Sequence, residues 1–132
     1  MASGKIQNPH LPIETYNLSA LTINPDVVDT SSSDYGAANI RKQGNVVIIN
    51  AQFRIKANLT ASQNLIAYLP EELKPIAGSQ RGWFITGGPS DIVVRYGGVD
   101  ISNGGCIYIN YPVFTSSKYM FCSITYIAAT ST

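Results

Sequence analysis

The sequence predicts a small all-β domain, an antiparallel, jelly-roll-like β-sandwich of about eight strands. Short apolar and β-branched runs are separated by Gly, Pro, Asn, Asp and Ser at intervals of roughly 8–15 residues, as in sandwiches and barrels. Two of these runs, at 46–57 and 118–128, alternate with period two. Helix signals are nearly absent, because the single candidate turn at 71–74 is bracketed by Pro70 and Pro75.

The length of the chain, 132 residues, is that of a single domain, and an apolar content of 45% is enough for a core without metals or disulfides. Residues 1–12 contain Pro9 and Pro12 around His10 and have no periodicity. We expect them to form an N-terminal arm or linker, and residues 13–132 to form the sandwich.

The strand at 46–57 has one apolar face and one mostly polar face. Val46 and Ile48 are exceptions on the polar face, and Tyr119 and Phe121 are similar exceptions in the run at 118–128. A monomeric sandwich has no need of apolar residues outside its core, whereas a subunit interface does. We therefore expect a homotrimer with Val46, Ile48, Tyr119 and Phe121 at its subunit contacts.

Charge and composition exclude several classes of function. Only 13% of residues are charged, the net charge is +1, and no basic stripe supports nucleic-acid binding. No apolar run approaches the ~20 residues of a membrane helix, so membrane insertion is not expected. Cys106 and Cys122 lie in apolar runs and favour buried free thiols over a disulfide. Together with His10 they do not form a zinc site, so no metal or cofactor is expected.

No catalytic constellation is recognisable, and we expect a non-enzymatic protein. A His-based triad would require His10 to fold back from the arm. Asp91 and Asp100 border neighbouring predicted strands, and a glycan-cleaving pair of carboxylates is the enzymatic alternative. Aspartates that cap turns beside Gly, Pro and Ser are the more ordinary interpretation.

Aromatic and polar residues are interleaved between residues 83 and 114. An aromatic face that stacks on a sugar ring, with a few placed polar groups, is a common form of saccharide site. Packing in the core or at an interface is the alternative for each aromatic residue. The residues predicted for the saccharide site are Trp83, Arg81, Asp91, Arg95, Tyr108 and Tyr111.

One segment has a familiar layout. Residues 41–53 (RKQGNVVIINAQF) are followed by 66–70 (IAYLP) and then by Lys74-Pro75. A basic residue, a glycine, an alternating strand, an apolar strand ending in Leu-Pro and a second proline resemble the C-terminal head modules of bacteriophage tail fibre and baseplate receptor-binding proteins.

The resemblance implies a homotrimer of β-sandwich heads at the tip of a phage tail. Such a head attaches the virion to host cell-surface saccharides without cleaving them, and contacts other tail or baseplate proteins. Residues 1–12 would then be the end of a neck. The binding residues vary too much within the family to be transferred. A structural virion module without glycan binding, and a cellular trimeric lectin-like or tumour necrosis factor-like sandwich, remain alternatives.

Overall fold

The computed structural model describes residues 11–31, 33–57, 59, 63–76, 78, 80–86, 95–102, 104–110 and 118–130. These residues form nine strands and two short 3-10 helices, which confirms the predicted all-β class. The strands are β1 (Ile13–Tyr16), β2 (Thr22–Ile23), β3 (Gly36–Gln43), β4 (Val46–Ile55), β5 (Gln63–Tyr68), β6 (Gln80–Thr86), β7 (Arg95–Ile101), β8 (Cys106–Asn110) and β9 (Lys118–Ile127). The 3-10 helices are η1 (Leu18–Ala20) and η2 (Glu71–Leu73), and η2 is the turn predicted between Pro70 and Pro75.

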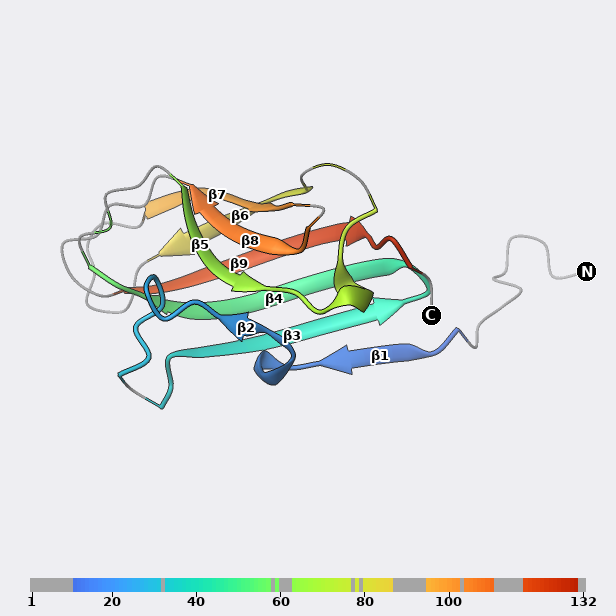
Figure 1. Ribbon diagram of the computed structural model, residues 1–132, viewed down its shortest axis with the longest axis horizontal. Coiled ribbons are helices and arrows are strands. Elements are labelled where there is room, and N and C mark those ends of the chain that lie inside the picture. The colour runs from blue at the N-terminus through green and yellow to red at the C-terminus, as the bar shows by residue number, and fades with distance from the viewer. Residues whose placement is uncertain are drawn as a thin grey trace, which may run out of the picture.

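The strands pair antiparallel in the order β1-β3-β4-β9-β6-β7-β8-β5-β2. This continuous sheet bends over on itself, so that β7, β8 and β5 lie across from β9, β4 and β3 (Figure 1). β6 pairs with both β9 and β7. It therefore joins the first layer, which contains β9, β4 and β3, to the second layer, which contains β7, β8 and β5. Val28 forms a bridge with Ile55 at the end of β4, which brings the segment after β2 back to the first layer. The result is the predicted antiparallel sandwich.

The core lies between the two layers. In β4, Val47, Ile49, Phe53 and Ile55 are at most 1% exposed, as the period-two pattern predicts. β9 adds its own alternate positions, and the second layer supplies mainly isoleucines. These further core residues are Met120, Cys122, Ile124, Tyr126, Ile66, Ile101, Ile107 and Ile109.

A buried lysine fastens the C-terminal segment to η2. Lys42 is 0% exposed, and its Nζ donates to the carbonyl of Glu72 at 2.6 Å and to Oγ1 of Thr130 at 3.4 Å. The hydroxyl of Tyr126 donates to the carbonyl of Leu73 nearby. Because the side chains of Lys42 and Tyr126 are buried, these hydrogen bonds offset a desolvation cost that would otherwise oppose folding.

The sequence also predicts a first strand region at 13–23, a short strand at 40–42 and a turn at Gly97-Gly98, and the structure corrects all three. The strand expected at 40–42 begins at Gly36, because β3 pairs with β4 as far as Phe53. The strand region expected at 13–23 is interrupted at Asn17, whose Oδ1 accepts a hydrogen bond from the backbone N–H of Ser19 and caps η1. Gly97-Gly98, expected to be a turn, lies inside β7 and pairs with β6.

Candidate functional site

The outer face of β3, β4, β9 and β6 is built from rows of side chains that cross the strands. Asn39 lies opposite Asn50, Asn50 opposite Ser123, and Ser123 opposite Trp83. All four side chains are exposed. Since neighbouring strands are about 4.8 Å apart, this first row is roughly 14 Å long.

A second row runs parallel to the first, two residues further along each strand. Ala37 lies opposite Gln52, Gln52 opposite Phe121, and Phe121 opposite Ile85. Phe121 is 43% exposed and Ile85 is 49% exposed, so this row places apolar surface beside the polar groups of the first row. The two rows are about 7 Å apart, the distance of two residues along a strand.

These two rows line a hollow of about 810 Å³. Its volume lies within the usual range of ligand sites. Among the lining residues that the structure describes, none is a carboxylate, a lysine, an arginine or a histidine. The lining consists of Ala37, Ala38, Asn39, Asn50, Ala51, Gln52, Trp83, Phe84, Ile85, Phe121, Cys122 and Ser123.

Trp83 is the most exposed large apolar residue of the described chain, with 73% of its surface accessible. Its neighbours across the strands are Ser123 on β9 and Gly98 on β7, one small and one without a side chain. The indole is therefore not covered from either adjoining strand. Burying such a ring against a ligand is favourable, so its exposure indicates a binding role more than a structural one.

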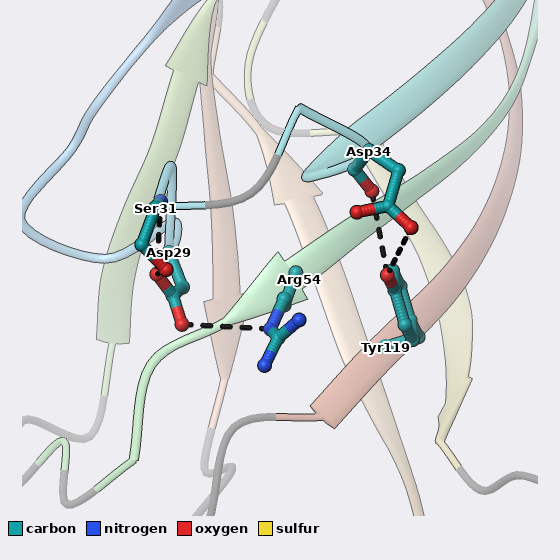
Figure 2. Close-up of polar contacts among 5 residues, drawn as sticks. All are labelled: Asp29, Ser31, Asp34, Arg54 and Tyr119. Carbon is teal, nitrogen blue, oxygen red and sulfur yellow. Dashed lines mark hydrogen bonds and ion pairs between the residues drawn. The ribbon is translucent and has the colours of Figure 1, made fainter.

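A polar cluster borders the hollow beyond the second row, where Arg54 lies opposite Tyr119 (Figure 2). Arg54 Nε lies 3.4 Å from Oδ2 of Asp29. The other carboxylate oxygen, Oδ1, accepts hydrogen bonds from the backbone N–H and the hydroxyl of Ser31. The hydroxyl of Tyr119 donates to the carboxylate of Asp34 at 3.0 Å. The guanidinium of Arg54 lies 5.9 Å from the centre of the Tyr119 ring. These contacts hold Asp29 against β4 and Asp34 against β9.

At the opposite end of the same face lies an aliphatic patch, formed by Ile13, Val46, Ile48 and Ile127. Ile13 is 59% exposed and the other three are 40–41% exposed. Val46 lies opposite Ile127, and Gln43 lies between Ile13 and Val46 in the same row. Ile48 lies in the next row, between Arg41 and Thr125, and the first row separates it from Phe121.

The structure brings some of the predicted site residues together and separates others. Trp83 lines the hollow from β6, and Arg81 is exposed two residues before it on the same strand but outside the lining. Tyr108 is half-buried on β8 in the other layer. Arg95 lies on β7, but its side chain is outside the part of the structure that is described. Asp91 and Tyr111 lie outside the described residues. A hydrogen bond with the side chain of Cys106 and burial raise the pKa of Tyr108.

The residues predicted for subunit contacts lie in three different parts of the outer face. Val46 and Ile48 belong to the aliphatic patch, while Phe121 lines the hollow and Tyr119 belongs to the polar cluster. All four lie on the outer side of the first layer, as their positions in the two alternating strands predict. They do not form one continuous apolar surface.

Sequence reasoning missed Asn39, Asn50, Gln52 and Ser123 as site residues. Polar residues on an outer strand face are the most ordinary residues of a β-protein. A signal was present, because Asn50 and Gln52 follow Val46 and Ile48 on the same outer face of one strand. The change from apolar to polar along that face marks the boundary between the aliphatic patch and the hollow.

The hollow has little chemistry beyond binding. Among the described lining residues the one ionisable group is Cys122, and burial raises the pKa of this thiol to about 12. Both Cys106 and Cys122 are free thiols, as predicted, but only Cys122 is buried and Cys106 is half-buried. Within the described ranges no group of three or more His, Cys, Asp or Glu residues is placed to hold a metal ion. In the same ranges no helix is long and apolar enough to cross a membrane.

Comparison with known proteins identifies the fold. No family model matches the sequence, and no curated protein matches it. The chain is similar in structure to the head domain of lactococcal phage bIL170, with a TM-score of 0.60 and 13% sequence identity. The match covers 89% of this chain and 99% of the phage chain. The crystal structure of that head domain raised the question of whether the receptor-binding domains of lactococcal phages share a common fold. The predicted resemblance to phage receptor-binding heads is thus confirmed at the level of the fold.

Proposed function

We propose that this chain is the receptor-binding head domain of a phage tail protein, which attaches the virion to saccharides on the host cell surface. The observation on which the proposal depends is the hollow, where an indole that is 73% exposed adjoins a row of neutral polar side chains. The similarity to the head domain of phage bIL170 supports the phage context. An aromatic face beside amides and a hydroxyl suits a sugar ring, which has one apolar side and a rim of hydroxyls.

The proposed attachment is non-enzymatic. Hydrolysis of a glycosidic bond ordinarily needs two carboxyl groups across the substrate. The described part of the lining contains none. The buried thiol of Cys122 stays protonated at neutral pH and is a poor nucleophile. We expect no release of reducing sugar when the chain is incubated with cell-wall glycan.

Binding to cells tests the proposal directly. Fluorescently labelled chain is added to a panel of lactococcal strains and unrelated bacteria, and the bound fraction is measured. We expect selective binding that competes with phage adsorption and is lost after periodate oxidation of the cells but not after protease treatment. Trp83→Ala should abolish binding, whereas Tyr68→Ala, which truncates a 45% exposed aromatic residue on β5, should not. Protease-sensitive binding would indicate a protein receptor, and no binding to any strain would favour a structural virion module.

We also propose that the domain acts as a homotrimer, held partly by the aliphatic patch. Exposed aliphatic side chains gathered at one end of a sheet are stabilised when a second copy covers them. Three weak sites per trimer would bind a cell surface with useful avidity. Light-scattering mass should give three copies, and Ile48→Asp should give monomers. Thr22→Asp, an exposed change on β2, is the control. A wild-type monomer at micromolar concentration would exclude the trimer without affecting the saccharide proposal.

A further inference from the structure

We propose that the hollow accommodates two consecutive uncharged sugar rings, laid across the strands from Trp83 on β6 to Asn39 on β3. This inference rests on the proposed function and goes further, because it gives the length, direction and charge of the recognised glycan segment. It follows from the two rows of side chains and from the charges around them.

The length follows from the first row. Four strands span roughly 14 Å, and a pyranose ring is about as wide as the spacing between two neighbouring strands. A single ring placed on Trp83 would reach Ser123 but not Asn39. Two linked rings cover roughly 10 Å of the row, and a hydrogen bond of about 3 Å joins the second ring to the amide of Asn39. A third ring would leave no room for that hydrogen bond and would extend beyond β3. The hollow's 810 Å³ is also far more space than a single ring needs.

The two ends of the row suit different parts of such a segment. At β6, the indole of Trp83 adjoins a serine and a glycine, so the apolar side of one ring can stack on it. At β3 and β4, Asn39 and Asn50 offer amides that both donate and accept hydrogen bonds. Hydroxyls of the second ring require that combination. Phe121 in the second row provides an apolar wall beside the linkage.

The charges favour an uncharged segment. Of the lining residues that the structure describes, none provides a positive charge to pair with a carboxylate or phosphate. At the rim beyond the second row, Arg54 is already paired with Asp29. Two further cations with described side chains, Arg41 and Arg81, lie outside the lining, each two residues along its strand from a member of the first row. An anionic group inside the hollow would lose hydration without gaining a counter-charge.

The test uses glycan from the bacterial strain that binds the labelled chain. Its wall polysaccharide is partly hydrolysed and separated by size into one-, two-, three- and four-ring fractions, and by anion exchange into neutral and charged pools. Titration calorimetry with the full chain measures affinity. We expect the neutral two-ring fraction to bind at least tenfold more tightly than the one-ring fraction, with less than a threefold gain beyond it.

Two variants separate the ends of the site. Asn39→Ala should reduce two-ring affinity to the one-ring level and leave one-ring affinity unchanged. Trp83→Ala should weaken both at least tenfold, and Thr22→Ala should change neither. Equal affinity for one and two rings, a continued rise to four rings, or binding of the charged pool alone would overturn this inference and leave saccharide attachment intact. If no fraction bound while the cells did, saccharide recognition itself would fail.

Discussion

Gly82 lies so close to Ser123 that a Cβ at residue 82 would stand 2.5 Å from the Ser123 carbonyl oxygen. The same Cβ would lie 2.8 Å from Cβ of Ile124. Glycine is therefore required for β6 to approach β9 at this point. The approach matters for the hollow, because the next residue, Trp83, pairs with Ser123 and ends the first row.

Gly82→Ala should destabilise the fold and disturb the hollow together. The added methyl group meets backbone, which cannot move aside cheaply, so we expect a loss of about 1–3 kcal/mol in the free energy of unfolding. Denaturant unfolding and cell binding measure the two effects. Gly104→Ala is the matched control, because a Cβ there would lie 3.7 Å from Ser102 Oγ, an ordinary contact. Equal unfolding free energies for the two variants would contradict the prediction.

The core was predictable because its pattern is local. In β4 and β9 every second residue is apolar, and each such residue from Val47 to Ile55 is buried. Gly97-Gly98 misled the assignment for an equally local reason, since two adjacent glycines usually indicate a turn. In the folded chain Gly97 pairs with Phe84 and Gly98 pairs with Trp83. Both partners are more than ten residues away in the sequence, so a local pattern does not reveal the pairing.

The hollow could be predicted only in part. Trp83 can be singled out from the sequence because it is the one tryptophan of the chain. Phe121 can be singled out because it is an apolar residue on the polar side of an alternating strand. Asn39, Asn50 and Ser123 become a site only through the registers β3–β4, β4–β9 and β9–β6. Those registers join segments separated by up to about eighty residues, and no local pattern specifies which residues will lie opposite one another.

The hydrogen bond between Tyr119 and Asp34 should be measurable by a double-mutant cycle. Tyr119→Phe removes the hydroxyl that donates to the carboxylate and keeps the ring near Arg54. Because the pair is exposed, we expect a coupling energy of only about 0.5–1 kcal/mol between Tyr119→Phe and Asp34→Ala. Unfolding free energies of the two single variants and the double variant provide it. Strictly additive effects would show that the contact does not stabilise the loop.

Stability should fall as the solution becomes alkaline. The ordinary pKa of a thiol is 9.0 here, and burial raises that of Cys122 to about 12. Between these values the unfolded chain has lost the proton that the folded chain keeps, so rising pH favours unfolding. Burial raises the pKa of Tyr126 as well, which adds to the effect.

Denaturant unfolding from pH 8 to about pH 11 should show this decline. Cys122→Ala removes one of the groups with a raised pKa and should flatten the slope, although its stability at neutral pH will be lower because of the small cavity left behind. An identical slope in the wild type and the variant would mean that the Cys122 thiol ionises as readily in the folded chain as in the unfolded one.

Phe84 and Phe121 should divide stability from binding. They lie on paired strands, yet Phe84 is 4% exposed in the core and Phe121 is 43% exposed in the hollow. Phe84→Ala should cost about 3–5 kcal/mol of unfolding free energy through the cavity it creates. Phe121→Ala should cost less than about 1 kcal/mol, as is usual at exposed positions, but should weaken cell binding at least tenfold. Chemical denaturation and the labelled-chain assay measure both quantities on each variant. If Phe121→Ala left cell binding unchanged, the apolar wall of the hollow would not contact the receptor, and the site would be restricted to the first row.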